Sequence, residues 1–146
     1  MKKICIHLTE RVTYKWPLEY VIELIGRLTK LGHEVYAVSD ENNIKIEDKN
    51  PLLFDRLHLT DDLSKLVIAK CDVFVGPPLK YYQMARELGV RTVALLGCTY
   101  SGEGVKTTAP CGGCRENIEN VNDCVFEDEL CMWELTPLDV MEDVCK

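Results

Sequence analysis

Short apolar runs alternate along this chain with segments whose apolar residues recur at helical spacing. Runs rich in Ile, Val and Leu, bounded by polar or turn-forming residues, are typical of buried strands. Apolar positions three or four apart, preceded by a proline or a hydroxyl group and followed by glycine, are typical of helices. The predicted strands are residues 3–8, 34–38, 57–59, 72–75 and 92–96. The predicted helices run from Pro17 to Gly32, from Thr60 through Val67, from Tyr81 to Gly89 and from Thr136 to Val144.

This alternation predicts one α/β domain. Strands joined through helices form a parallel sheet, and the helices cover both of its faces. We therefore expect a Rossmann-like parallel sheet of about five strands in a single domain over residues 1–146, with a cysteine-rich loop at about 98–135. Ligands of such sheets bind beyond the carboxyl ends of the strands. Those ends are residues 7–13, 39–42, 76–79 and 97–102.

Size and charge narrow the functions that this domain can have. The chain has 146 residues, of which 47% are hydrophobic, and a formal net charge of −7. That charge argues against a duplex nucleic-acid partner, which needs a basic surface, whereas a small anion needs only one or two local donors. No apolar run reaches the roughly 18 to 20 residues of a membrane span, and residues 1–6 lack the pattern of a signal peptide. We therefore expect a cytoplasmic protein without a membrane span.

The eight cysteines fall into two groups. Cys5, Cys71 and Cys98 lie in or beside predicted strands, where a buried thiol behaves as a small hydrophobic group, and Cys145 stands apart. The others lie in the polar segment before the last helix and begin with a Cys-Gly-Gly-Cys motif: Cys111, Cys114, Cys124 and Cys131. Four thiolates suit a tetrahedral structural zinc site. Reduced thiols, disulfides and an iron–sulfur cluster are the alternatives that the sequence leaves open.

Several segments, taken in order and spacing, are similar to those of one known enzyme family. Residues 15–17 are Lys-Trp-Pro and are similar to the Lys-x-Trp-Pro segment of that family. Residues 72–76, 88–90 and 93–99 look like its Gly-Val-Pro-Val-Val-Ala-Leu-Phe-Gly-Pro-Thr region, and residues 131–140 resemble its Cys-Met and Thr-Pro ending. Together these segments resemble glycosyltransferase family 9, the heptosyltransferases, and the resemblance covers nearly the whole chain.

This resemblance implies the donor-binding half of a two-domain enzyme of the GT-B type. In the family, the C-terminal half binds a nucleotide-sugar donor, usually ADP-heptose, and the N-terminal half supplies the acceptor site and the catalytic base. The chain looks like the C-terminal half alone, so the resemblance implies that it carries no catalytic residue. If it takes part in catalysis, it would do so as a glycosyltransferase that needs a second domain or chain.

Eight residues are candidates for binding a nucleoside diphosphate or a nucleotide sugar: Thr9, Lys15, Asp40, Glu41, Gly76, Lys80, Gln83 and Thr99. By resemblance, Thr9 faces the phosphates, Lys15 lies beside the position of a family lysine, and Glu41 falls where a family glutamate holds the ribose. The family's Asp-Thr/Ser-Gly-x-x-His turn falls on residues 78–83, where Lys80 replaces the glycine and Gln83 the histidine. A lysine at the start of a helix can still attract an anion.

Each candidate also has a structural alternative. The charged residues can be solvated surface groups, and Gln83 can be an exposed helix residue. Trp16 is expected to pack in the core, and His7, His33 and His58 are expected to be structural or exposed, because they are scattered along the chain.

The sequence favours a nucleotide or nucleotide-sugar binding domain related to glycosyl transfer, not catalytic alone. Two alternatives stay open. One is the donor-binding subunit of a split glycosyltransferase, working with an acceptor-domain protein. The other is a non-catalytic protein-interaction module, with an exposed apolar patch that could also serve a homodimer.

Overall fold

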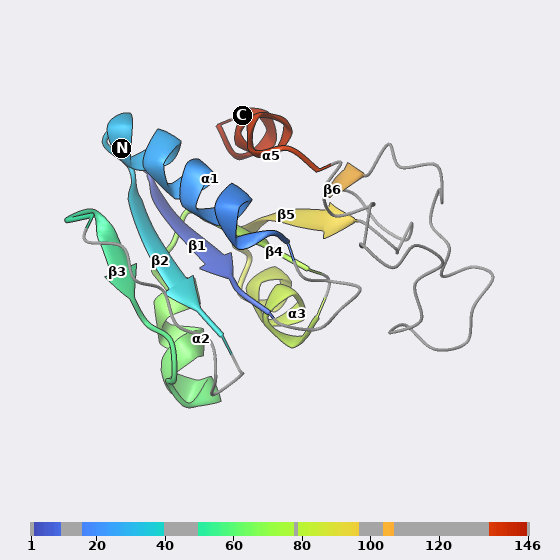
Figure 1. Ribbon diagram of the computed structural model, residues 1–146. Helices are drawn as coiled ribbons and strands as arrows, with labels where there is room; N and C mark the ends of the chain where they lie inside the picture. The colour runs from blue at the N-terminus through green and yellow to red at the C-terminus, as the bar shows by residue number, and fades with distance from the viewer. Residues whose placement is uncertain are drawn as a thin grey trace.

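The computed structural model describes residues 2–9, 16–39, 50–77, 79–96, 104–106 and 135–145. Six strands in this part of the chain form one sheet, and every neighbouring pair is parallel (Figure 1). The order is β3-β2-β1-β4-β5-β6, so the direction in which the sheet grows reverses between β1 and β4. The strands are β1 (Lys3–His7), β2 (Glu34–Val38), β3 (Leu53–Asp55), β4 (Val73–Gly76), β5 (Arg91–Leu96) and β6 (Gly104–Lys106).

Two of the helices begin at the capping residues that the sequence predicts. α2 (Asp61–Ala69) begins after Thr60, whose hydroxyl accepts a hydrogen bond from the Leu63 amide at 3.3 Å. α5 (Pro137–Val144) begins after Thr136 in the same way, with a proline in its first turn. α1 (Leu18–Lys30) follows Pro17, and α3 (Lys80–Glu87) follows Leu79 without a side-chain cap. None of the helices in the described ranges is long and apolar enough to cross a membrane.

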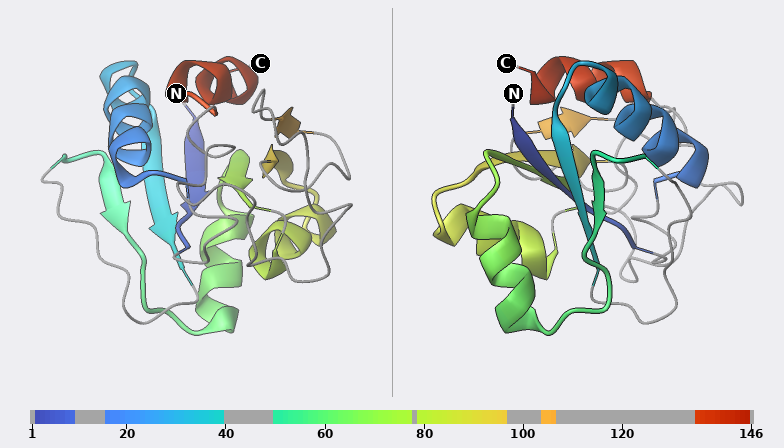
Figure 2. Two further views of the ribbon diagram at one scale, coloured as in Figure 1. Left: turned by 45° about the vertical axis from the view of Figure 1, so that its right-hand side comes forward. Right: turned by 90° about the vertical axis from the view of Figure 1, so that its left-hand side faces the viewer.

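The helices cover both faces of the sheet, as the two views of Figure 2 show. α1 and α5 lie on one face, over a core that contains Ile4, Ile6 and Val75. α2 and α3 lie on the other face, over a second core that contains Cys5 and Phe74. Alternate residues of one strand therefore serve different cores, as the period of two along a strand requires. The expected Rossmann-like fold is confirmed.

Two expectations about the strands were wrong. β3 is not at residues 57–59 but four residues earlier. Just after β3, the Arg56 amide donates to the Ala37 carbonyl of β2 at 2.9 Å. The Asp55 carboxylate accepts from the Leu57 amide at 3.0 Å, and His58 has a φ of 65°, so a turn follows. Leu57 is buried in this turn, and an apolar residue buried in a turn looks in the sequence like a residue of a buried strand. β6, paired with β5, lies inside the segment that was expected to be loop.

The ends of α5 are tied to distant parts of the chain. The indole Nε1 of buried Trp16 donates to the Leu135 carbonyl at 2.6 Å, just before the helix begins, which confirms the packing role of this tryptophan. At the other end, the Arg91 guanidinium donates to the Val144 carbonyl at 2.9 Å and to that of Asp143. A cation at the carboxyl end of a helix also suits the helix dipole.

Candidate functional site

The carboxyl ends of β1 and β4 meet at the point where the sheet reverses its order of growth. Parallel α/β sheets bind ligands at this position, because the flanking connections lead to opposite faces and leave a crevice between them. Two of the predicted binding residues lie here. Thr9 follows β1 by two residues and is 8% exposed, and Gly76 is the last residue of β4. The Leu8 amide donates to the Val38 carbonyl at 3.0 Å, which holds the chain at Thr9 against the end of β2.

Gly76 is required by close packing at this edge. A Cβ at this position would lie 2.8 Å from the Cβ of His7 and 3.2 Å from two atoms of the Phe74 ring. The first distance is far below van der Waals contact, and a Cβ cannot turn away as the end of a side chain can. Gly76 therefore brings the two central strands together without a side chain between them.

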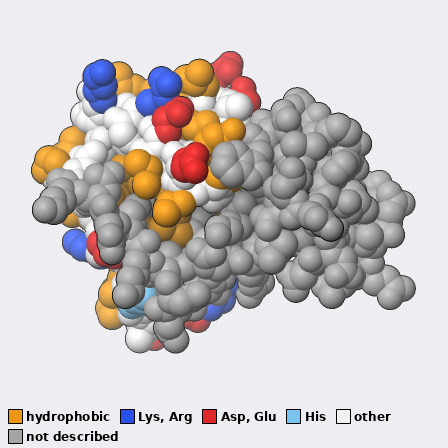
Figure 3. Space-filling view, in the orientation of Figure 1, with side chains coloured by type: hydrophobic (Ala, Val, Ile, Leu, Met, Phe, Trp, Pro, Cys, Tyr) orange, Lys and Arg blue, Asp and Glu red, His pale blue; other side chains and the backbone are white. Residues whose placement is uncertain are grey.

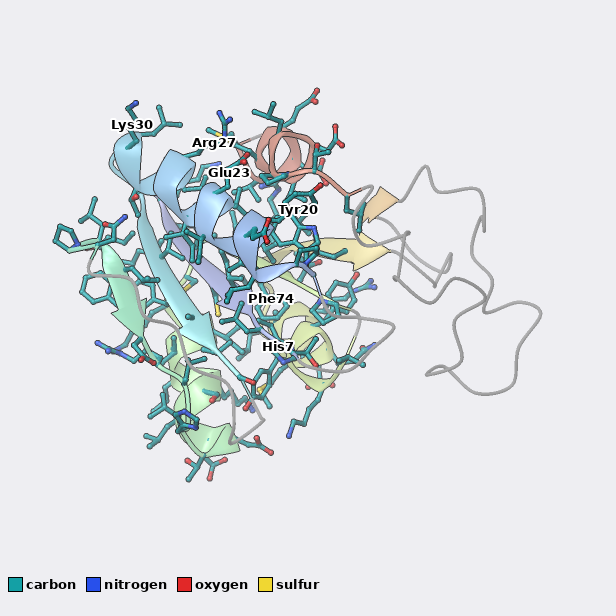
Figure 4. All side chains as sticks on the ribbon, viewed as in Figure 1. His7, Tyr20, Glu23, Arg27, Lys30 and Phe74 are labelled. Carbon is teal, nitrogen blue, oxygen red and sulfur yellow. The ribbon has the colours of Figure 1, made fainter. Side chains whose placement is uncertain are left out.

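His7 lies at this edge beside Gly76, within the strand end that the sequence predicted at residues 7–13, although it was not among the predicted binding residues. It is buried, and its ring faces the rings of Tyr81 and Phe74, with centroid distances of 4.9 and 6.4 Å. Figure 4 shows His7 and Phe74 close to α3. Of the two expectations for this residue, the structural one fits and the exposed one does not. The sequence signal that could have made His7 a candidate is its position as the last residue of β1, where the strand reaches the predicted ligand edge.

The first turn of α3 reaches the same edge and is attached to α2. The hydroxyl of Tyr81, which is fully buried, lies 3.3 Å from the Asp61 carboxylate and 3.3 Å from the Ser64 hydroxyl. The ammonium group of Lys80 lies 3.0 and 3.1 Å from the two oxygens of Asp61. Both side chains of this ion pair are about half exposed, so the pair contributes little stability and can exchange for another anion at small cost.

The structure places the remaining candidates as follows. Gln83 is exposed on the second turn of α3, beyond the residues that line the edge. Thr9, Gly76 and Lys80 are thus brought to one edge of the sheet, with Gln83 further along the helix. The candidates outside the described residues are Lys15, Asp40, Glu41 and Thr99, and the metal candidates Cys111, Cys114, Cys124 and Cys131.

Two thiols behave as the sequence predicted, as small hydrophobic groups on the α2 and α3 side of the sheet. Cys5 is fully buried, and this burial raises the pKa of its thiol well above the usual value. A hydrogen bond from Cys5 lowers the pKa of the neighbouring Cys71, whose sulfur also lies 3.3 Å from the Val67 carbonyl. Both thiols lie away from the carboxyl edge and belong to the core.

Comparison with known proteins gives a fold and no sequence family. No protein-family model and no curated protein matches the sequence. Among solved structures, the iron-containing dodecameric glycosyltransferase TibC from enterotoxigenic E. coli H10407 matches with a TM-score of 0.77 at 15% identity, over 99% of this chain and 44% of TibC. The complex of TibC, an iron-containing heptosyltransferase, with ADP-D-β-D-heptose matches with a TM-score of 0.79 at 16% identity, over the same shares.

A further match is E. coli ADP-heptose LPS heptosyltransferase II, with a TM-score of 0.74 at 15% identity, over 99% of this chain and 45% of the enzyme. The chain therefore spans less than half the length of these glycosyltransferases and has the fold of that part of them. The resemblance seen in the sequence is confirmed at the level of the fold.

Proposed function

We propose that this chain binds a nucleoside diphosphate or a nucleotide sugar at the carboxyl edge between β1 and β4, as a domain related to glycosyl transfer. The observation that carries the proposal is the reversal of strand order at this edge, where Thr9, Gly76 and the first turn of α3 meet. A matching structure of the same fold contains ADP-D-β-D-heptose, which supports this class of ligand.

The chemistry of the edge suits a diphosphate. The first-turn amides of α3 have no partner within the helix and carry the positive end of its dipole. The Thr9 hydroxyl can donate one hydrogen bond from the β1 side. Lys80 supplies a mobile positive charge when it leaves Asp61 for the stronger negative charge of a phosphate. In this proposal Lys15 and Thr99 add donors to the phosphates, and Asp40 and Glu41 accept from the ribose hydroxyls.

Catalysis by this chain alone is not part of the proposal. The chain spans 44% of TibC, so transfer would need an acceptor-binding domain from the rest of a longer protein or from a separate chain. A donor-binding subunit of a split glycosyltransferase fits this arrangement. The partners of the domain would then be the nucleotide and an acceptor-domain protein.

Calorimetric titration with ADP, UDP, GDP and ADP-sugars tests the proposal. We expect one diphosphate to bind, and both Thr9→Val and Lys80→Ala to weaken it several-fold. Thr92→Val and Lys65→Ala are the matched controls, because Thr92 lies near the amino end of β5 and Lys65 on the exposed side of α2. The absence of heat with every ligand, or equal loss in the control variants, would refute the proposed site.

A protein-interaction role is the second candidate, and the exposure of large apolar side chains favours it. Leu66 and Leu138 are 59% and 57% exposed, and they lie on opposite faces of the domain, on α2 and α5. If no nucleotide binds, these surfaces become the first places to look for a partner protein.

A further inference from the structure

The outer face of α1 carries an apolar ridge that is open to solvent. Leu18 and Ile22 are 49% and 43% exposed, although both are large apolar residues. Gly26 continues the series, and residues four apart form one ridge on a helix surface. Figure 3 shows hydrophobic side chains along α1 beside its charged residues. Leu18, Ile22 and Gly26 therefore lie in one row on this face, with exposed charged residues beside them.

Gly26 is not explained by the fold of one chain. A glycine inside a helix is less stable than alanine because it costs more backbone entropy. Here a Cβ would meet no atom within 4 Å, and the φ of Gly26 is not among the positive values that favour glycine. What glycine does provide is a place on the ridge where a second helix can approach closely.

The charges on the same face divide between the two halves of α1. Glu19 and Glu23 lie toward its amino end, and Arg27 and Lys30 toward its carboxyl end. Figure 4 shows Glu23, Arg27 and Lys30 projecting from the outer side of the helix. Glu23 and Arg27 already form an ion pair within the helix at 3.1 Å. Glu19 and Lys30 are left at the two ends, about 16 Å apart along the helix axis, too far to meet within one chain.

We propose that this face binds a second copy of the chain, with α1 packed antiparallel on α1 about a two-fold axis. In an antiparallel pair centred near position 24, Ile22 of each copy lies over Gly26 of the other. The same register places Leu18 along the aliphatic part of Lys30 and brings Glu19 of each copy to Lys30 of the other. The outer face of α1 in one copy is thus complementary to the same face in the other copy, which a two-fold interface requires.

The expected association is weak. A single pair of helices buries less surface than a standard protein interface, so the dissociation constant should be micromolar or higher. Sedimentation velocity on the full chain, from about 5 to 500 µM, covers that range. We expect a concentration-dependent equilibrium between monomer and dimer. Ile22→Arg should raise the dissociation constant at least about tenfold, because it places a charge at the centre of the contact.

Charge reversal tests the register. Glu19→Lys and Lys30→Glu each put like charges together twice in a two-fold dimer, so each should weaken self-association several-fold. A mixture of the two single variants, however, restores both opposite-charge pairs in the mixed dimer and should associate as strongly as the unmodified chain. Because the two residues cannot meet within one chain, only contact between copies explains such a rescue.

Several outcomes would overturn the proposal. A monomer at every concentration would do so, as would a dimer that Ile22→Arg leaves intact, or single charge variants that do not associate with each other. Leu66→Arg is the matched control, because Leu66 is equally apolar and 59% exposed but lies on α2 across the sheet. If it disrupts the dimer as much as Ile22→Arg does, the interface is elsewhere. Circular dichroism of each variant shows whether the fold is retained.

Discussion

Replacing Gly76 by alanine gives a sharp test of the packing at the carboxyl edge. The new Cβ would lie 2.8 Å from the Cβ of His7 and 3.2 Å from the Phe74 ring. His7 and Phe74 are both buried, and β1 and β4 are bound on both sides by other strands, so neither strand can move away freely. Overpacking of this kind costs about 1 to 3 kcal/mol. Alanine recovers roughly 0.5 to 1 kcal/mol of that in backbone entropy.

Because the 2.8 Å contact is with another Cβ, which cannot rotate away, the upper part of that cost applies, about 2 to 3 kcal/mol. Less about 1 kcal/mol of backbone entropy, the net expectation is a loss of about 1 to 2 kcal/mol. For a chain of this size that corresponds to a decrease in Tm of about 2 to 8 °C. Urea unfolding measures it, as a lower midpoint with an unchanged slope. Gly26→Ala is the control, since its Cβ meets nothing and should stabilise the helix by up to about 1 kcal/mol. A Gly76→Ala protein as stable as the original would refute the packing argument.

Three further predictions concern a cap, a histidine and a metal. Thr60→Ala removes the hydroxyl that accepts from the Leu63 amide, and should lower the free energy of unfolding by about 1 kcal/mol in urea titration. Burial lowers the pKa of His33, whose Nδ1 accepts from the Lys2 amide at 2.9 Å, so the folded state favours the neutral ring. The contribution of His33 to the free energy of unfolding is therefore fully present above pH 6.5, the ordinary pKa of the ring, and is lost as the pH falls through the lowered pKa of the folded state. In a plot of urea midpoint against pH, His33→Gln should flatten the curve in this pH range. If the four cysteines bind zinc, elemental analysis should find about one zinc per chain, lost in Cys111→Ser and kept in Cys145→Ser. Iron in place of zinc would indicate an iron–sulfur cluster, and neither metal would leave thiols or disulfides.

Most of the fold followed from local signals in the sequence. Thr60 and Thr136 predicted the starts of two helices, because a hydroxyl at the cap satisfies an amide that has no partner within the helix. Gly32 and Gly89 predicted two helix ends, and both have the positive φ that glycine tolerates, 89° and 75°. These features depend on a few neighbouring residues, so the sequence shows them directly.

The errors came from features that only the tertiary structure decides. Leu57 is buried by a turn held by the Asp55 side chain, and burial alone gives it the apolar character of a strand residue. β6 is only three residues long and is defined by its pairing with β5. The place of His7 beside Gly76 depends on the register between β1 and β4, which no local pattern reveals.

The attachment of α5 has a consequence for the synthesis of the protein. Val140 and Val144 lie in the same core as Ile4 and Val93. α1 covers part of this face of the sheet, and α5 covers the part over β5 and β6. About 40 residues separate β5 from α5, and a ribosome needs about 2 to 8 s to add them. During that interval the apolar surface that α5 will cover is without its helix and can associate with other chains. Variants that weaken the docking of α5 should therefore first appear as aggregation and chaperone dependence during expression, before any loss of stability in the purified protein.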